Sequence, residues 1–362
     1  MPVAQHPRRI DEITAEWMTR ALREGGVCRA SIVEDIRIQP IGGGFGFLSG
    51  LARVELDFDS AEPDVPRSVV VKLPASAESN RQTGDSFRAY EREVRFYREI
   101  APQSDVRTTR CYYSVLEPEQ DRYVLVLEDV SSMTLGDQVK GVTIPQARDA
   151  LRTIGGFHAQ WWKSPRLDEL TWMPTHNLDL PHLFSENWHD FRNQFAAELG
   201  GAEARVGDRV SRHGQQIADL MAAAPRTIVH WDYRADNLVF DETTKEEPVV
   251  VLDWQLAQRA MGAFDATRLI CGSVTTKLQG HRHRELLTIW HETLCAKGVD
   301  DYPFEQAWRE YQIGLLIALY LPVAFHHVAS YEGGRGLEFA RATMHRLFHA
   351  AVECDADAVL VD

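Results

Sequence analysis

The chain is poor in cysteine and lacks a long apolar segment. Its 362 residues include 5 cysteines without Cys-x-x-Cys spacing, and an odd number fits no closed disulfide framework. Free thiols are typical of a reducing compartment, so we expect a cytoplasmic protein. The segment Met1–Arg9 has no apolar signal-peptide core. The longest apolar run, Ile313–Phe325, is shorter than a membrane span and contains Pro322, which predicts a buried helix and no membrane insertion.

Positive charge is in the minority. Lys and Arg number 39 against 53 Asp and Glu, which gives a formal net charge of -14. A general nucleic-acid-binding surface needs an excess of basic residues, so we expect no nucleic-acid partner. Hydrophobic residues make up 44% of the chain, enough for a substantial core, and we find no internal repeat or low-complexity linker. Nothing in the sequence predicts an oligomeric state.

Hydrophobic periodicity divides the chain into a β-rich part and a helical part. A helix is predicted over Ile10–Glu24, with Asp11 as its candidate cap and Gly25-Gly26 as its end. Strand patterns follow, with one helix among them: Ile36–Ile41, Leu51–Phe58, Ser68–Leu73 and Arg122–Glu128, with the helix near Ser86–Ile100. Helical patterns dominate after Val130. The sequence predicts an α+β protein with a hinge at Val130–Gly136 between residues 1–129 and 130–362.

Two acidic motifs lie in the otherwise helical second part. In Val229–Phe240, Asn237 follows Asp232 by five residues; in Val249–Gln255, Asp253 ends an apolar strand pattern. Phosphoryl transfer needs a carboxylate that accepts a proton, together with an amide and a second carboxylate that bind Mg²⁺. The order of the motifs and the turn-rich connector between them make the pair more specific than either motif alone. Together they predict a phosphoryl-transfer site.

A glycine-rich turn, Gly42–Gly50, stands between two strand patterns. Its small residues can bring backbone N–H groups close to phosphate oxygens, and the candidate contacts are Gly44, Gly46 and Ser49. The turn lacks the Gly-Lys-Ser/Thr ending of a Walker loop and leads into a strand, so neither a P-loop nor a Rossmann site is indicated. Alone, such a segment is more often an ordinary turn.

Lys72 stands in an apolar strand pattern, Val69–Pro74, where a buried ammonium group needs an anionic partner. In the next helix, Glu93 lies three residues after Tyr90 on the apolar face, and we expect it to be that partner. Alone, each residue is better explained as a lysine with its tip in water and an ordinary helix charge. Their order between the glycine-rich turn and the acidic motifs favours the pair.

The end of the β-rich part offers a candidate contact for an adenine ring. In Leu125–Val130, backbone groups of Glu128 and Val130 are placed to offer donors and acceptors to the adenine edge. An ordinary strand end explains this segment equally well.

Two polar residues of the helical part are expected to be structural. His158 falls on the apolar face of a helix that begins with a candidate capping box, Thr143–Gln146, and we expect it in the core. Asp265 is expected to cap a helix over Ala266–Cys271.

Neither a metal site nor a hydrolase site is predicted from histidine or serine motifs. His281–His283 and His326–His327 lack accompanying ligands at metal-binding spacing, so solvated helix ends are expected and no zinc. The chain also has no Gly-x-Ser-x-Gly nucleophile elbow.

With these motifs, the chain resembles the aminoglycoside phosphotransferase and choline kinase superfamily, particularly its ecdysteroid-kinase-like (CHK-like) branch. The resemblance extends over most of the chain. Trp231 stands where the family more usually has the glycine of His-Gly-Asp, and Trp254 follows Asp253 where protein kinases have Asp-Phe-Gly. The second difference matches the CHK-like branch. Trp231 either reshapes the substrate pocket or packs under its loop.

The resemblance implies a bilobal protein-kinase-like fold with a small β-rich N-terminal lobe, which binds the nucleotide, and a larger, mostly helical C-terminal lobe, which binds the substrate. Asp232 would orient the acceptor hydroxyl and take its proton. Asn237 and Asp253 would hold Mg²⁺ against the phosphates of ATP. Lys72 would contact phosphate oxygens, Glu93 would position Lys72, and the glycine-rich turn would cover the nucleotide.

The implied activity is transfer of a phosphoryl group from ATP to a hydroxyl of a small molecule. An aminoglycoside, an amino alcohol, a sugar and a sterol-like alcohol all stay open as acceptors. The alternative is a nucleotide-binding pseudokinase with a regulatory role, which is disfavoured because folding alone requires none of the five site residues. Transfer of a nucleotide, with release of pyrophosphate, is a third possibility that nothing in the motif order suggests.

Overall fold

The structure is a computed structural model that describes residues 6–41, 48–60, 62–117, 119, 122–175, 180–324, 326 and 335–361. The chain divides into two compact units. The first unit comprises residues 1–103, 108–133 and 252–256, and the second comprises 104–107, 134–251 and 257–362. Asp253 therefore belongs to the first unit, and Asp232 and Asn237 belong to the second. A single boundary in the sequence does not predict this exchange of short segments.

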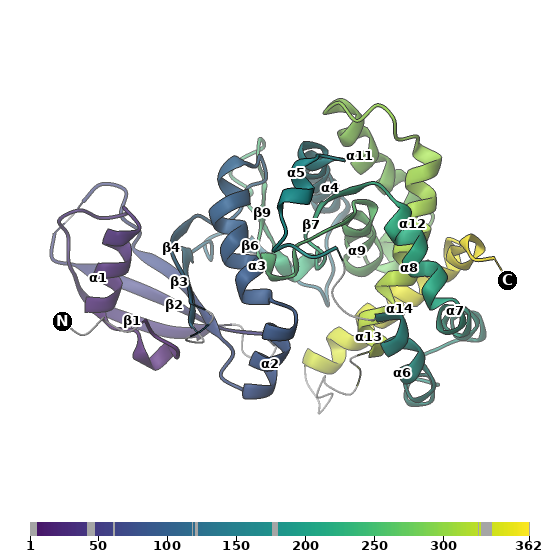
Figure 1. Ribbon diagram of the computed structural model, residues 1–362, viewed down its shortest axis with the longest axis horizontal. Helices are drawn as coiled ribbons and strands as arrows, with labels where there is room; N and C mark the ends of the chain where they lie inside the picture. The colour runs from purple at the N-terminus through teal and green to yellow at the C-terminus, as the bar shows by residue number, and fades with distance from the viewer. Residues whose placement is uncertain are drawn as a thin grey trace. The chain divides into compact units, whose positions relative to one another are not determined.

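The first unit is built on a five-stranded antiparallel sheet with the strand order β1-β2-β3-β5-β4 (Figure 1). Its strands are β1 (Val33–Ile41), β2 (Ser49–Phe58), β3 (Ser68–Pro74), β4 (Cys111–Glu117) and β5 (Arg122–Glu128). Its helices are η1 (Ile10–Glu12), α1 (Ala15–Glu24), α2 (Glu78–Ser86), α3 (Ala89–Arg95), η2 (Phe96–Ile100), η3 (Ala101–Gln103) and η6 (Trp254–Leu256).

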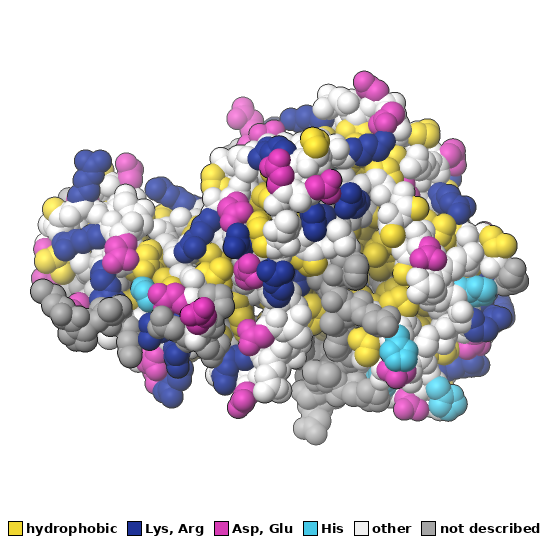
Figure 2. Space-filling view, viewed as in Figure 1, with side chains coloured by type: hydrophobic (Ala, Val, Ile, Leu, Met, Phe, Trp, Pro, Cys, Tyr) yellow, Lys and Arg dark blue, Asp and Glu magenta, His cyan; other side chains and the backbone are white. Residues whose placement is uncertain are grey.

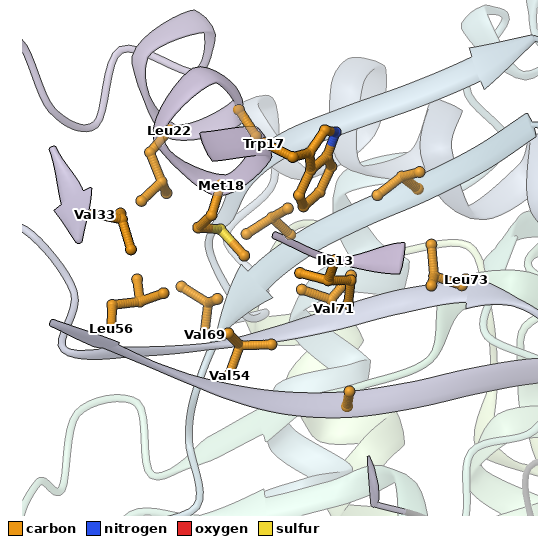
Figure 3. Packing of buried hydrophobic residues seen from close by; sticks show 14 of the residues in the cluster. Ile13, Trp17, Met18, Leu22, Val33, Val54, Leu56, Val69, Val71 and Leu73 are labelled. Carbon is orange, nitrogen blue, oxygen red and sulfur yellow. The ribbon is translucent and has the colours of Figure 1, made fainter. Parts of the chain in front are cut away.

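Helix α1 packs its apolar side against one face of this sheet (Figure 3). Trp17, Met18 and Leu22 of α1 belong to one buried cluster with Val69 and Val71 of β3. Because side chains alternate between the two faces of a strand, the residue between Leu73 and Val71 projects to the opposite face. That residue is Lys72. The α1 core thus fixes which face of β3 presents the lysine.

Two helix starts in this unit differ from the prediction. The cap of α1 is Thr14, whose side chain accepts a hydrogen bond from Trp17 N, and the predicted cap Asp11 lies in the preceding 3-10 turn. The helix predicted near Ser86–Ile100 begins only at Ala89, because Arg88 has a left-handed backbone with φ of 52°. Left-handed backbone interrupts a right-handed helix, so α2 and α3 are separate elements.

The second unit is mostly helical (Figure 1). It also holds two small antiparallel sheets of strand order β10-β7 and β6-β8-β9. Its strands are β6 (Thr134–Leu135), β7 (Arg226–Val229), β8 (Leu238–Phe240), β9 (Val249–Val251) and β10 (Gln258–Met261). Its helices are α4 (Ile144–Trp161), α5 (Arg166–Glu169), α6 (Leu180–Gln194), α7 (Gly201–Arg212), α8 (Gly214–Ala223), η5 (Ala235–Asn237), α9 (Ala263–Ser273), α10 (Thr276–Gln279), α11 (His283–Ala296), α12 (Phe304–Ala318), α13 (Tyr320–Ala324), α14 (Arg335–Glu353) and η7 (Ala356–Val359).

Helix α9 forms the centre of the second unit. Every residue of α9 is buried, and the helix contacts α4, α11, α12 and α14. The capping box predicted at the start of α4 is present, with Thr143 and Gln146 as its two members. The apolar run that begins at Ile313 is helical and mostly buried, as predicted, but it divides into the end of α12 and the separate short helix α13.

None of the described helices is both long enough and apolar enough to cross a membrane. Figure 2 shows acidic and basic side chains interspersed over the visible face, without a broad region of one sign.

Candidate active site

In the first unit, Lys72 is held between two carboxylates. Its Nζ lies 2.7 Å from Glu93 Oε2 and 2.7 Å from Asp253 Oδ1. The lysine side chain is 6% exposed and that of Glu93 is 1% exposed, so both charges are removed from water and depend on each other. The ion pair between Lys72 and Glu93 that the sequence predicts is therefore present.

The electrostatics of this cluster favour a charged lysine. Burial alone would lower the pKa of Lys72, but the adjacent carboxylates of Asp253 and Glu93 outweigh it and raise the pKa. Tyr123 of β5 donates a hydrogen bond of 2.6 Å to Glu93 Oε2, which gives the buried carboxylate a second partner. Sequence reasoning missed Tyr123, because nothing in its strand pattern distinguishes it from a core residue.

Asp253 has a left-handed backbone, with φ of 62°. The next residue, Trp254, stacks on Phe96 with ring centroids 3.9 Å apart and planes 8° apart. Gln255 Nε2 donates to Asp253 Oδ2 at 3.3 Å, and Gln255 Oε1 accepts from Ser49 Oγ at 3.4 Å. Aromatic stacking and side-chain hydrogen bonds thus hold Asp253 against Lys72.

Three other residues predicted to contact the nucleotide, Ser49, Glu128 and Val130, lie in the same unit. Ser49 begins β2 and is placed beside Gln255 by the hydrogen bond described above. Glu128 ends β5, and its backbone N–H donates to Arg110 O at 2.8 Å. Val130 O accepts from Met133 N at 3.0 Å in the turn that follows. Gly44 and Gly46 lie outside the described residues, so their role stays a prediction.

In the second unit, Asp232 follows β7 in a short irregular segment that ends at η5. The amide nitrogen of Asn237 donates to Asp232 O at 2.8 Å and to Asp232 Oδ2 at 3.0 Å. These bonds orient the amide and leave its carbonyl oxygen as the atom available to a ligand. The side chain of Asp232 is 21% exposed, so a small molecule can reach its carboxylate.

Two arginines also contact Asp232. Arg234 Nε lies 2.9 Å from Oδ2, and Arg268 Nη2 of α9 lies 2.9 Å from Oδ1. Burial alone would raise the pKa of Asp232, but Arg234 and Arg268 outweigh it and hold the pKa at about 2. Asp232 is therefore ionised throughout the neutral range. Sequence reasoning singled out neither arginine.

The backbone around Asp232 is fixed by Asp265, which lies within the first turn of α9 and does not cap it. The Asp265 carboxylate accepts the backbone N–H of His230 at 2.6 Å and that of Trp231 at 2.8 Å. The predicted capping role is wrong because α9 begins earlier, at Ala263, and the carboxylate turns towards the loop after β7. A tertiary contact of this kind has no local sequence signal.

His158 is a fully buried core residue, as predicted, and it supports Asp265. Trp290 Nε1 donates to His158 Nδ1 at 3.0 Å. An indole N–H can only donate, so Nδ1 accepts and the ring proton is on Nε2. His158 Nε2 lies 3.2 Å from Asp265 Oδ2 and donates to it. A chain of hydrogen bonds therefore runs from α11 to the loop that carries Asp232.

Trp231 packs inside the second unit. Its ring lies 4.1 Å from that of Phe264, and the residue is 4% exposed. Its φ is 72°, in the left-handed region that favours glycine. Of the two alternatives drawn from the sequence, these contacts support packing under the loop.

One expectation for the histidines is wrong. His283 is buried rather than solvated: its Nδ1 lies 2.7 Å from Tyr311 Oη and its Nε2 lies 3.2 Å from Glu353 Oε2. His326 is also buried, whereas the His281 side chain is fully exposed. Among the described histidines of these two motifs, only His281 is solvated, and His327 lies outside the described residues.

Solved structures of small-molecule kinases share the fold of this chain. The GDP complex of wild-type aminoglycoside 2'-phosphotransferase-IIIa has a TM-score of 0.57 and 12% identity, over 91% of this chain and 97% of that chain. A microcompartment-associated aminopropanol kinase has a TM-score of 0.56 and 12% identity, over 95% and 98%. An ethanolamine kinase of Plasmodium vivax has a TM-score of 0.53 and 12% identity, over 91% and 85%. The chain therefore has a mixed α+β kinase-like fold.

Comparison by sequence identifies the protein family to which the chain belongs. No curated protein matches the chain. The sequence pattern of the Ecdysteroid kinase-like family matches residues 43–298, more than half of the chain, and this stretch includes all the site residues described above. The resemblance identified from the motifs is thus confirmed, and the chain belongs to the Ecdysteroid kinase-like family.

Proposed function

We propose that the protein is an ATP- and Mg²⁺-dependent phosphotransferase that moves the γ-phosphoryl group to a hydroxyl of a small molecule. The observation that carries the proposal is the buried contact of Lys72 with both Glu93 and Asp253, because a lysine fixed in this way presents a cation to phosphate oxygens. The kinase-like fold and a structural relative solved as a GDP complex support nucleotide binding.

The residues fit the cofactors that the fold implies. Mg²⁺ prefers oxygen ligands, and the carboxylate of Asp253 and the amide oxygen of Asn237 supply them in this proposal. When bound, Mg²⁺ neutralises negative charge on the phosphates. The contacts of the amide nitrogen with Asp232 direct the Asn237 oxygen away from that residue, as a ligand atom requires.

Asp232 orients the acceptor and receives its proton in the proposed mechanism. A carboxylate with a pKa of about 2 is a weak base. In a loose phosphoryl-transfer transition state, however, the acceptor hydroxyl keeps its proton until the bond to phosphorus is forming. The position of the carboxylate therefore matters more than its basicity. Asp232 accepts the hydrogen bond of the hydroxyl, aligns the oxygen, and takes the proton as the oxygen loses its basicity.

The test is ADP release from ATP and Mg²⁺ across a panel of aminoglycosides, amino alcohols, sugars and hydrophobic alcohols, repeated with GTP as donor. We expect one class to stimulate ADP release and Asp232→Asn to reduce that rate by about 10²–10⁴-fold. The matched control is Asp219→Asn, because Asp219 is an exposed aspartate of α8 that contacts Gln215. Nucleotide binding without acceptor-dependent release would favour the pseudokinase alternative.

A further inference from the structure

The carboxylate of Asp232 has unequal hydrogen-bonding capacity left on its two oxygens. An ionised carboxylate offers about four lone-pair positions, two on each oxygen. Among the described residues, Oδ2 accepts from Arg234 Nε at 2.9 Å and from Asn237 Nδ2 at 3.0 Å. Within the described part of the chain, Oδ1 accepts only from Arg268 Nη2, at 2.9 Å. A hydroxyl that donates to Asp232 therefore finds its free position on Oδ1, beside Arg268.

The two arginines differ in how fully they are paired. Arg234 spans two carboxylates, with Nε 2.9 Å from Asp232 Oδ2 and Nη1 2.6 Å from Asp236 Oδ2. Arg268 has one carboxylate partner, and its buried Nε has no hydrogen-bond partner within the described part of the chain. Arg268 therefore keeps hydrogen-bonding capacity beyond its contact with Asp232.

The position of Arg268 is fixed before any ligand binds. It stands on α9, whose residues are all buried, and its side chain is 6% exposed. Asp265, three residues earlier on α9, holds the backbone of the Asp232 loop through His230 N and Trp231 N. The same helix therefore positions both the loop and the guanidinium group, so the contact between Arg268 and Asp232 requires no rearrangement.

We propose that Arg268 is a further catalytic residue, which contacts the acceptor oxygen and the phosphoryl group that is transferred to it. This inference rests on the proposed function. An acceptor hydroxyl that donates a hydrogen bond to Asp232 Oδ1 lies next to Arg268 Nη2. The phosphorus that the acceptor oxygen attacks lies one forming bond further from Asp232. Guanidinium groups bind phosphoryl oxygens through paired, charged hydrogen bonds.

The step balances without any additional reactant. The acceptor oxygen forms a bond to the γ-phosphorus of ATP, and the bond between that phosphorus and the oxygen bridging to the β-phosphate breaks. The electron pair of the broken bond leaves with ADP. The hydroxyl proton passes to Asp232 Oδ1 and then to water. Arg268 stays charged throughout and stabilises the negative charge on the phosphoryl oxygens.

The test measures binding and needs no identified acceptor. Fluoroaluminate with Mg²⁺ and ADP imitates a phosphoryl group in transit, and a site built for the transition state binds this mixture more tightly than Mg²⁺ and ADP alone. Calorimetric titration compares the two affinities in the parent, in Arg268→Met and in Arg268→Lys. We expect the methionine variant to bind ADP within about twofold of the parent and to lose the fluoroaluminate enhancement by on the order of 10²-fold. The lysine variant, which keeps the positive charge, is expected to retain part of the fluoroaluminate enhancement.

Arg259→Met controls for the loss of a partly buried guanidinium group. Arg259 donates to the backbone oxygens of Met173 and Leu167, each at 2.7 Å, and none of its side-chain hydrogen bonds to described residues involves a site residue. If a folded Arg268→Met protein keeps the full fluoroaluminate enhancement of ADP binding, the inference is overturned. If the methionine variant does not fold, the same result in both Arg268→Lys and Arg268→Gln overturns it. A parent that binds ADP without any enhancement would also overturn it. A parent that binds no nucleotide contradicts the proposed function, and the inference falls with it.

Discussion

The carboxylate of Asp265 accepts the backbone N–H of Trp231 at 2.8 Å and so helps to hold a tryptophan in left-handed backbone geometry. An L-residue with a Cβ atom pays roughly 1–2 kcal/mol for this geometry. Packing of the indole against Phe264 offsets that cost. The identity of residue 231 therefore sets a balance between backbone strain and side-chain packing.

Replacement of Trp231 by glycine and by alanine separates these two contributions. Both variants lose the ring contact with Phe264, and we expect both to be less stable than the parent by about 3–5 kcal/mol. The glycine variant should be more stable than the alanine variant by about 1 kcal/mol, because glycine adopts a positive φ without strain. Urea unfolding measures both differences. An alanine variant as stable as the glycine variant would show that the backbone at residue 231 is not strained.

Gln138 braces the loop of Asp232 from the segment before α4. Its Oε1 accepts from Ala235 N at 3.0 Å and from Ser273 Oγ at 2.9 Å, and its Nε2 donates to Gly272 O at 2.7 Å. We expect Gln138→Leu to lower the free energy of unfolding by about 1–3 kcal/mol and to reduce turnover, because buried polar groups lose their partners and the loop loses a support.

Gln258 provides the matched control for Gln138. It is also fully buried, but neither atom of its side-chain amide has a hydrogen-bond partner among the described residues. Gln258→Leu should therefore leave the free energy of unfolding unchanged or raise it by up to about 1 kcal/mol. If urea unfolding shows the same loss in the free energy of unfolding for both leucine variants, the hydrogen bonds of Gln138 do not stabilise the loop.

Glu310 should make the stability of the second unit depend on pH. Burial raises the pKa of Glu310 above its ordinary value of 4.5, against hydrogen bonds from Tyr302 and Gln306 and the charge of Lys163. The folded state then holds this proton more tightly than the unfolded state. The resulting stability is fully present below pH 4.5 and is lost as the pH rises through the folded pKa.

Glu310→Gln removes this titration. The free energy of unfolding of the parent, followed by urea denaturation from pH 4 upwards, should fall relative to that of the variant, by at most about 1.4 kcal/mol per pH unit. Groups that titrate elsewhere are common to both proteins and cancel in the difference. Parallel curves would mean that Glu310 titrates alike in the folded and unfolded states.

Patterns of neighbouring residues predicted a strand, a helix start and one ion pair of the structure. The strand Arg122–Glu128 has the bounds predicted from the sequence, and the capping box at Thr143 starts α4. The contact between Lys72 and Glu93 was also predictable, because an apolar strand pattern buried the lysine and helix periodicity placed Glu93 on an inward face. The roles of these residues in binding a nucleotide stay predictions.

Tertiary contacts account for what the sequence did not reveal. Gln138 reaches Ala235 across 97 residues, and Arg268 reaches Asp232 across 36. Neither distance leaves a periodic signal in the chain. Arg88 has an ordinary sequence environment, yet its left-handed backbone moved the start of α3. Such features depend on the folded neighbourhood of a residue rather than on the residues next to it in sequence.

The most direct test of the central claim is transfer of label from ATP that carries the label in its γ-phosphate. The protein, Mg²⁺ and this ATP are incubated with the acceptor panel, and phosphate monoesters are separated from ATP and inorganic phosphate. The account predicts label in a monoester of one acceptor class with the parent, and its loss with Asp232→Asn. Bound ATP with no label in any monoester, or label in an acceptor only when the α-phosphate carries it, would contradict the account.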